Sequence, residues 1–391
     1  MNHDHSLDEL HQRIAALRRD LHAHPELAFS EARTSDAVAA ALTRLGIEVH
    51  RGLAKTGVVG RLRMGSGEGP AIGLRADMDA LPLEELNSFP HRSRHEGRMH
   101  ACGHDGHTAM LLGAAEVLAA RREGGPNGIV HFIFQPAEEH EGGGRVMVEE
   151  GLFERFPMER VFGLHNWPGL PAGRFAVMAG PIMAGTDRFD ITITGRGGHA
   201  AMPHQARDTV LAGAALVQSL QSLVSRSADP LEPAVVSVTR FHAGHADNVL
   251  PETAELGGTT RAFDPETQEM LATGMRRICQ GIELAHGVEI RLQYRRGYPP
   301  TINDAGATQL CREAAAEVSG GEQALVAAKP SMGAEDFAYL SNVVPGCYVW
   351  LGNGPGEGGC MLHSPHYDFN DAVIPTGIRY WVRLAEKALT P

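Results

Sequence analysis

The sequence has no long run of apolar residues and no excess of basic charge. No stretch approaches the roughly 18 consecutive apolar residues that a membrane-spanning helix needs. The first residues, Met-Asn-His-Asp-His, show no basic segment followed by an apolar one. The 35 Lys and Arg residues face 47 Asp and Glu residues, a formal net charge of −12. This balance argues against nucleic acid and anionic membranes as partners, because both require clustered positive charge, and it favours a small-molecule substrate.

Cysteines are few, and the sequence has no internal repeat. The five cysteines are odd in number and widely scattered, which fits reduced thiols better than a disulfide framework, so we expect a cytoplasmic protein. The composition, 43% hydrophobic and 21% charged, is ordinary for a globular protein, and 391 residues suffice for two domains. Histidine is abundant, with 21 residues partly in short clusters, which hints at metal binding.

Hydrophobic periodicity changes along the chain and predicts an inserted domain. An amphipathic helix opens the protein, and a Ser-x-x-Glu capping box places its start at Ser6. Short apolar strand patterns then alternate with helices, which predicts an α/β domain with a largely parallel sheet, and Gly-rich pieces such as Gly142–Gly144 predict loops. From 184 to 299 the order becomes strand, helix, strand, strand, helix, strand, as in ferredoxin-like α+β domains. We therefore predict one domain from residues 1–183 and 300–391, interrupted by a second at 184–299.

Two apolar strand patterns end at residues that can bind or position a metal ion. The run Phe132–Phe134 is followed by Gln-Pro-Ala and then by two adjacent carboxylates, Glu138 and Glu139. The run Val161–Leu164 stops at His165. Open α/β sheets bind ligands at the carboxyl ends of their strands. Adjacent residues of an extended chain point in different directions, so one glutamate can face a metal and the other a water; the alternative is a solvated acidic turn.

A cysteine and a histidine stand two residues apart directly before a predicted helix. Cys102 and His104, in the segment Met99–His107, are both good ligands for a borderline-soft divalent metal. Taken alone, the pair fits an ordinary loop cysteine beside a surface histidine equally well. Asp77 and Asp79 follow another apolar run and can either orient histidine ligands or serve only in a turn.

Six different motifs lie at intervals along the chain: Arg19–Leu27, Leu74–Pro82, the segment around Cys102, Gln135–Glu139, Gly163–Trp167 and Gly195–Ala200. Together they resemble the aminoacylase, hippurate hydrolase and auxin-conjugate hydrolase branch of the two-metal amidohydrolase and carboxypeptidase family. The resemblance implies a catalytic domain with a mixed, largely parallel sheet flanked by helices. It also implies that the inserted domain serves as a dimerisation or lid domain, in a homodimer or a dimer-based oligomer.

The resemblance implies a metal site and a general base. It implies two divalent ions per chain, zinc, manganese, cobalt or nickel, with Glu138 as the base. The implied ligands are Cys102, His104, Glu139, His165 and His363. Within Met361–His366 only the match to the family's His-Ser-Pro pattern favours His363 over His366.

In the inserted domain the resemblance implies a second group of residues that contact the substrate. His199 and Asn248 would reach a substrate or transition-state oxygen across a dimer contact, and Arg261 would grip a carboxylate. Without the family, each of these three would be interpreted as structural. The sequence departs from its relatives after Glu255, where Leu-Gly-Gly-Thr-Thr precedes Arg261 and a glycine replaces a larger residue, which could loosen this strand.

The implied activity is hydrolysis of the amide bond of an N-acyl amino acid, hippurate-like or N-acetylated, to a carboxylic acid and an amino acid. One alternative keeps the fold but makes the enzyme a dipeptidase or carboxypeptidase. A second is a non-catalytic metal-binding protein, although the base and all ligands are present. A cysteine protease is disfavoured, because His104 is too close to Cys102 in sequence to act as the usual remote base.

Overall fold

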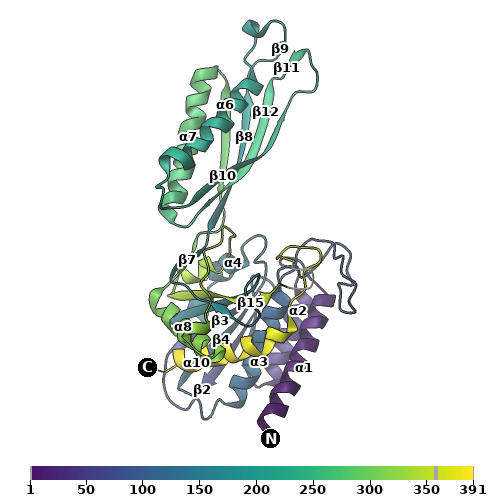
Figure 1. The fold of residues 1–391 in the computed structure, drawn as a ribbon, viewed down its shortest axis with the longest axis vertical. Helices are drawn as coiled ribbons and strands as arrows, with labels where there is room; N and C mark the ends of the chain where they lie inside the picture. The colour runs from purple at the N-terminus through teal and green to yellow at the C-terminus, as the bar shows by residue number, and fades with distance from the viewer. Residues whose placement is uncertain (1, 356–359, 391) are drawn as a thin grey trace. The chain divides into compact units, whose positions relative to one another are not determined.

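A computed structural model describes residues 2–355 and 360–390 and divides into two compact units (Figure 1). Unit 1 comprises Met1–Gly180, Ile302–Lys329 and Asp336–Pro391; unit 2 comprises Pro181–Thr301 and Pro330–Glu335. The sequence placed the inserted domain at 184–299. The short segment at 330–335 belongs to unit 2 because its backbone pairs with the start of that unit, where the amide of Ala184 donates to the carbonyl of Ser331 at 3.0 Å.

Unit 1 is built on a seven-stranded sheet with the strand order β1-β2-β4-β3-β5-β15-β6. The four central strands β4, β3, β5 and β15 are parallel, and β1, β2 and β6 are antiparallel to their neighbours. The predicted mixed, largely parallel α/β sheet is thus confirmed. The strands are β1 (Glu48–Leu53), β2 (Gly57–Met64), β3 (Ala71–Asp77), β4 (Gly128–Gln135), β5 (Arg160–Pro168), β6 (Phe175–Ala176) and β15 (Gly346–Gly354).

Helices flank this sheet on both faces. They are α1 (Asn2–Ala23), α2 (Ala32–Arg44), α3 (His104–Ala120), α4 (Gly143–Glu149), α5 (Leu152–Arg155), α8 (Ala305–Ser319), α9 (Ala338–Ser341) and α10 (Ile374–Ala388). Two predictions were wrong. Helix α1 begins at Asn2 and not at Ser6, since neither Pro nor Gly interrupts the residues between them. Gly142–Gly144 is not all loop, because α4 starts at Gly143. No helix of the described residues is long and apolar enough to cross a membrane.

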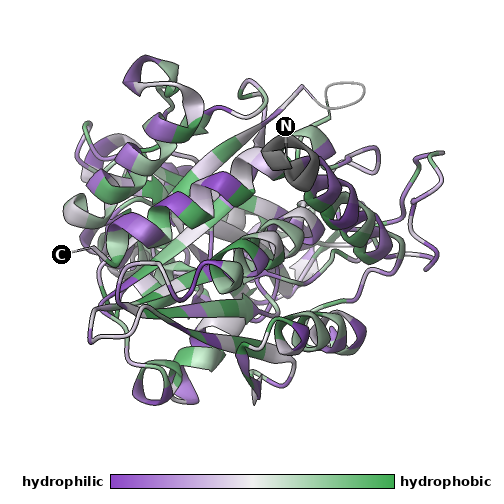
Figure 2. Cartoon of the chain, turned by 90° about the horizontal axis from the view of Figure 1, so that it is seen from below, coloured by the Kyte–Doolittle hydropathy of each residue, from purple (hydrophilic) through white to green (hydrophobic). Residues whose placement is uncertain are grey.

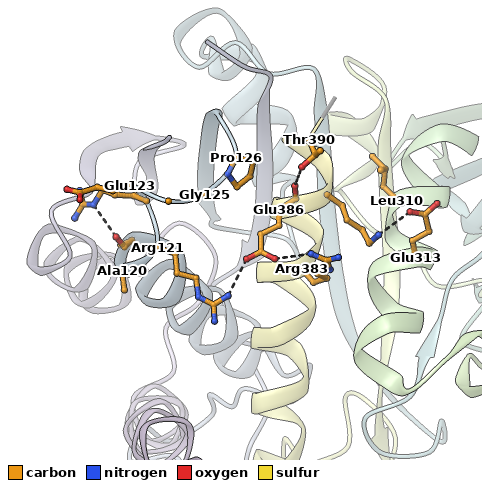
Figure 3. A pocket seen from close by; sticks show the side chains of 14 residues that line it. Ala120, Arg121, Glu123, Gly125, Pro126, Leu310, Glu313, Arg383, Glu386 and Thr390 are labelled. Carbon is orange, nitrogen blue, oxygen red and sulfur yellow. Dashed lines mark hydrogen bonds and ion pairs between the residues drawn. The ribbon is translucent and has the colours of Figure 1, made fainter. Parts of the chain in front are cut away.

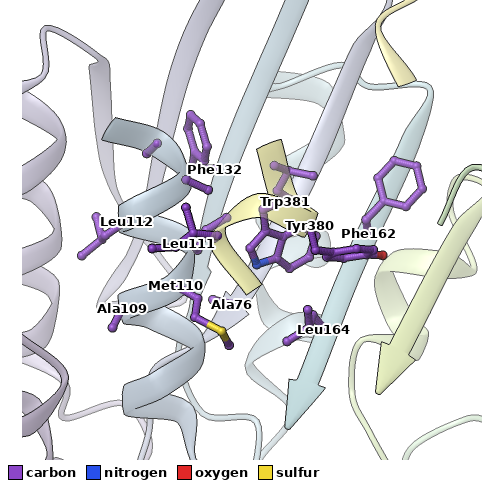
Figure 4. Packing of buried hydrophobic residues seen from close by; sticks show 14 of the residues in the cluster. Ala76, Ala109, Met110, Leu111, Leu112, Phe132, Phe162, Leu164, Tyr380 and Trp381 are labelled. Atoms are coloured by element: carbon purple, nitrogen blue, oxygen red, sulfur yellow. The ribbon is translucent and has the colours of Figure 1, made fainter. Parts of the chain in front are cut away.

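The main core lies between the sheet and helices α3 and α10 (Figure 4). Leu111 of α3, Phe132 of β4, Phe162 of β5 and Trp381 of α10 are buried there. Helix α3 is buried along most of its length, which explains why its sequence is apolar on nearly every side. Burying each of these large side chains stabilises the folded state by roughly 1.5–3 kcal/mol. In Figure 2 the hydrophobic residues accordingly follow the inner strands, and hydrophilic residues cover the outward surfaces of the helices.

A hollow of about 1250 Å³ opens at the C-terminal end of α3, beside α8 and α10 (Figure 3). Its charged side chains pair largely with one another: Arg121 and Arg383 bond Glu386, and Lys387 bonds Glu313. Helix α3 is about 25 Å long at the usual helical rise, so this hollow lies far from His104 at the other end of the helix. The ion pairs join three helices, and the hollow contains none of the predicted site residues.

Unit 2 is a four-stranded antiparallel sheet with two helices on one face. The strand order is β10-β12-β8-β13, and the chain order is the one predicted for 184–299. Asp208 and Asp264 cap the two helices by accepting from the backbone amides of Leu211 and Thr267. The elements are β8 (Gly185–Thr194), β9 (Gly198–His199), α6 (Thr209–Ser222), β10 (Ala234–Ala243), β11 (Val249–Leu250), β12 (Thr253–Ala262), α7 (Pro265–His286) and β13 (Glu289–Arg296); β7 (Gly180–Met183) and β14 (Thr301–Asn303) lie at the chain connections.

One of the two adjacent glycines in β12, Gly258, has a packing role. A Cβ added to Gly258 would lie 2.0 Å from the carbonyl oxygen of Ser237 and 2.5 Å from the ring of Phe189. Strand β10 shifts register directly opposite, between Val238 and Arg240. The glycine therefore lets the irregular strand β10 and the Phe189 ring approach β12 closely.

Gly258→Ala should destabilise unit 2 by about 2–3 kcal/mol, because a backbone oxygen must move to admit the methyl group. Gly257→Ala is the matched control, since the three atoms nearest to its added Cβ all belong to the end of the flexible Arg240 side chain, which can shift at little cost. Calorimetric melting should show a transition lowered by roughly 5 °C or more for the first variant and nearly unchanged for the second. Equal melting of both variants would contradict the assigned packing.

Candidate active site

The predicted ligands of unit 1 meet at the carboxyl edge of the parallel strands. Strand β3 ends at Asp77, β4 ends just before the two glutamates, and β5 carries His165 near its end. Helix α3 begins at His104. Potential ligand atoms lie within 4.8 Å of one another in three overlapping groups: Cys102, His104 and His165; Cys102, Glu139 and His363; and His104, Glu138 and Glu139.

Cys102 and His165 form a buried contact. The Cys102 Sγ lies 3.3 Å from the His165 Nε2, and the His165 Nδ1 donates to the carbonyl oxygen of Asn166 at 2.6 Å, which leaves the Nε2 lone pair directed at Cys102. Burial and the carboxylates of Glu139 and Glu138 raise the pKa of the Cys102 thiol. Burial lowers the pKa of His165. A cation at this position would favour the thiolate and the neutral imidazole, the forms that bind metal.

His104 is surrounded by carboxylates. Its Nδ1 lies 3.3 Å from the Asp79 Oδ1, and its Nε2 lies 3.9 Å from the Glu139 Oε1, but neither ring nitrogen has a hydrogen-bond partner. Burial lowers the pKa of His104, yet Asp77, Asp79 and Glu139 outweigh this effect and raise the pKa to about 10. The carboxylates around His104 therefore stabilise a positive charge on its ring or next to it.

The two glutamates stand on a backbone turn held by two other carboxylates. Ala137 has a left-handed backbone (φ 57°), and its amide donates to the Glu31 Oε1 at 2.9 Å. The amides of Glu138 and Glu139 each donate to one oxygen of Asp79 at 3.0 Å. A left-handed alanine is strained by about 1–2 kcal/mol, so these three bonds fix a conformation that the chain alone would not adopt.

His363 reaches this cluster from the C-terminal segment. Its Nε2 lies 3.2 Å from the Glu139 Oε1, and its amide donates to the carbonyl of Ala101 at 2.8 Å, beside Cys102. Burial raises the pKa of Glu139, but the imidazoles of His363 and His104 outweigh it and lower that pKa. The groups of potential ligands found in the described residues include His363 and do not include His366.

Sequence reasoning missed the residues that hold Asp77 in place. The buried Arg75 donates to the Asp77 Oδ2 at 2.8 Å and to the Asp336 Oδ1 at 2.9 Å. The His107 Nδ1 bonds the other Asp77 oxygen at 2.6 Å, and the His107 Nε2 accepts from the Asn166 amide. Asp77 therefore orients His107, while Asp79 faces His104. An arginine inside an otherwise apolar strand was the available signal for this network.

The donor set suits two divalent cations. It offers one cysteine sulfur, three imidazoles and a carboxylate, ligands that borderline metals accept. The groups Cys102–His104–His165 and Cys102–Glu139–His363 share only Cys102, as two neighbouring ions with one common ligand would require. Both ring nitrogens of His104 and the Oε1 of Glu139 are buried without a hydrogen-bond partner. Such atoms are rare in proteins unless a ligand or ion satisfies them.

In unit 2 the predicted residues occupy opposite ends of the sheet. His199 in β9 pairs with Val249 in β11, and the amide of Ala200 donates to the carbonyl of Asn248 at 3.0 Å, so His199 and Asn248 are close together. The β9–β11 pair adjoins the end of β12 at which Thr253 lies, whereas Arg261 lies near the other end of this strand. At the usual rise of a strand, Thr253 and Arg261 are on the order of 25 Å apart.

Comparison with known proteins gives a consistent family assignment. The family model described as Peptidase family M20/M25/M40 matches residues 73–387. The hippurate hydrolase of Campylobacter jejuni is 40% identical over 381 residues, 97% of this chain and 98% of that protein. The N-acetylcysteine deacetylase of Bacillus subtilis is 40% identical over 377 residues, 96% of each chain.

Among solved structures, a dinuclear metal-binding peptidase of the M20 family from Bacillus subtilis superposes with a TM-score of 0.85. It is 36% identical, and the match covers 98% of this chain and 99% of that one. The resemblance inferred from the six motifs is confirmed, and the chain belongs to the peptidase family M20/M25/M40.

Proposed function

We propose that this protein is a two-metal amidohydrolase that cleaves N-acyl amino acids into a carboxylic acid and an amino acid. The observation that carries the proposal is the buried Glu138 beside two ligand groups that share Cys102. The hippurate hydrolase and deacetylase relatives support the acyl amino acid as substrate. All five cysteines are unpaired thiols, which supports our placing of the enzyme in the cytoplasm.

The chain's own residues supply the proton transfers and the substrate contacts. Cys102, His104, Glu139, His165 and His363 would hold two divalent ions, which supply Lewis acidity and make water a stronger acid. Glu138 takes the proton of the attacking water and returns it to the departing amine, so one carboxylate serves both steps. Asp79 keeps Glu138 in position through the backbone of the turn.

The substrate contacts come from unit 2. His199 donates to the oxyanion that forms as the amide carbonyl is attacked, a charge present only near the transition state. Asn248, beside it, contacts a substrate oxygen. Arg261 binds the carboxylate of the amino acid, since among the residues that the structure describes its donors meet only the neutral oxygens of Thr186, Thr259, Thr260 and Met332.

A peptidase acting on dipeptides or peptide C-termini would use the same residues. Hydrolysis of acetyl-, benzoyl- and glycyl-amino acids by one preparation distinguishes the two functions. We expect the enzyme to prefer the acetyl or benzoyl compounds. A preference for the glycyl dipeptides would show that the protein is a peptidase instead.

Glu138→Gln should lower kcat by roughly two or more orders of magnitude while two metal ions per chain remain bound, because a base is lost and no ligand is removed. The measurements are kcat for the best acyl amino acid and metal content by elemental analysis. The control Glu149→Gln, in an exposed position of α4, should leave both unchanged.

Cys102→Ala gives the complementary result, since loss of the shared ligand should lower metal content as well as kcat. Near-normal turnover in Glu138→Gln would rule out the assigned base. Retention of two ions in Cys102→Ala would rule out the assigned site.

Arg261→Ala should penalise N-acyl amino acids and scarcely affect their C-terminal amides, because the missing guanidinium binds only the charged carboxylate. The loss should correspond to roughly 1.5–3 kcal/mol in kcat/KM. Arg261→Lys should recover only part of it, since a point charge does not reproduce a bidentate contact. An equal loss on acid and amide would make Arg261 a structural residue.

The separation of His199 and Arg261 within one chain supports a homodimer, since a small substrate cannot touch both unless they come from different chains. An apolar patch in unit 2 suits such an interface: Val210 and Leu211 of α6 are 42% and 59% exposed, and Phe241 of β10 packs on Gly213 nearby. Strand β10 is also an edge strand, whose free backbone groups can pair with a second copy.

Leu211→Glu should convert the dimer to monomers, as measured by sedimentation velocity. It should also lower kcat, because the substrate contacts that the partner chain supplies are lost. Leu284→Glu is the control, since Leu284 is 88% exposed on α7 and its replacement adds the same charge elsewhere. A wild-type protein that sediments as a fully active monomer would contradict the homodimer.

A further inference from the structure

The sheet of unit 2 has one face without helices, and this face is rich in arginine. Phe189, Ile191 and Ile193 of β8 point into the core beneath α6 and α7. The alternate residues, Arg188 and Asp190, lie on the opposite face, because side chains of a strand alternate between the faces.

Arg188 lies beside Arg261 on this face. In the antiparallel register Arg261 is opposite Thr186 and Thr259 is opposite Arg188, so the two arginines are diagonal neighbours on adjacent strands. Diagonal neighbours in antiparallel sheets are about 7–8 Å apart, within reach of long side chains. Arg261 also donates to the hydroxyls of Thr186 and Thr259, which places its guanidinium along the row that contains Arg188.

The positive charge at this end of the face is not neutralised by the unit itself. Arg240 and Arg295 both pair with Asp190, so one carboxylate serves two arginines. In the part of the chain that the structure describes, Arg261 donates only to neutral oxygens, and Arg188 has no carboxylate partner. Burial and the charge of Arg188 lower the pKa of Arg261. Two neighbouring guanidinium groups repel, so an anionic ligand would relieve the repulsion.

We propose that Arg188 is a specificity-determining residue that binds a second carboxylate beside the one held by Arg261. The preferred substrates are then N-acyl amino acids with an acidic side chain, N-acyl aspartate and N-acyl glutamate. This inference rests on the proposed amidohydrolase function and on Arg261 as the site of the α-carboxylate. The exposed Arg188 charge makes the preference sensitive to salt.

The test compares N-acetylglutamate with N-acetylglutamine, which have nearly the same shape and differ by one charge. Wild-type enzyme should favour the glutamate by about tenfold in kcat/KM at low ionic strength, and the ratio should fall as salt is added. Arg188→Gln should bring the ratio close to one by lowering only the glutamate value. Arg188→Lys should keep most of the preference, because it retains the charge.

Arg291→Gln is the matched control. Arg291 is exposed on the same face of β13, opposite Thr192, farther along the sheet from Arg261. Its loss removes the same net charge and should leave the ratio unchanged. The inference is overturned if wild type shows no preference, if Arg188→Gln lowers both substrates equally, or if Arg291→Gln has the same effect.

If the enzyme hydrolyses none of these compounds, the proposed function fails, and thermal shift with each ligand decides the inference separately. Stabilisation by N-acetylglutamate and not by N-acetylglutamine, lost in Arg188→Gln, would support the carboxylate site without any turnover. Equal stabilisation of wild type and Arg188→Gln would overturn it.

Discussion

Negative charge buried at the carboxyl edge of the parallel strands is the constraint on which the catalytic unit depends. Asp77, Asp79 and Glu139 lie there with almost no access to solvent. Buried carboxylates remain charged only when cations or hydrogen-bond donors surround them. Arg75 compensates Asp77 from within the sheet, and His104 is driven toward protonation by the others. The negative charge of the carboxylates that Arg75 and His104 do not compensate explains why the site suits divalent cations.

The hydrogen bonds around this charge explain why residues distant in sequence come together. Asp79 and Glu31 accept the backbone amides of one turn, so the same carboxylates that need donors also position the glutamates. On the opposite side Asn166 donates to the carbonyl of Cys102 and accepts from the hydroxyl of Tyr367. Burial raises the pKa of Glu31 to about 7, which shows how costly its buried charge is.

Strand ends were the most informative feature of the sequence. Apolar runs that stop at polar residues located Glu138, Glu139 and His165, because parallel strands bring their carboxyl ends to one edge. His363 could not be found this way, since it lies in an irregular segment with a left-handed backbone (φ 64°) and depends on a contact with Glu139 far away in sequence. The role of Gly258 was equally hidden, because only the register shift of β10 reveals the close approach.

The order of the strands has a consequence for synthesis on the ribosome. Strand β15 lies between β5 and β6 in the sheet but is made after the whole of unit 2, and His363 follows it. A nascent chain can therefore complete most of unit 2, from a continuous stretch, while the sheet of unit 1 still has an internal gap. Pairings between such distant segments form slowly. In the proposed metal site, stable capture of both ions would therefore wait until the segment that carries His363 has emerged, and chains truncated before it would carry the acidic residues without this ligand.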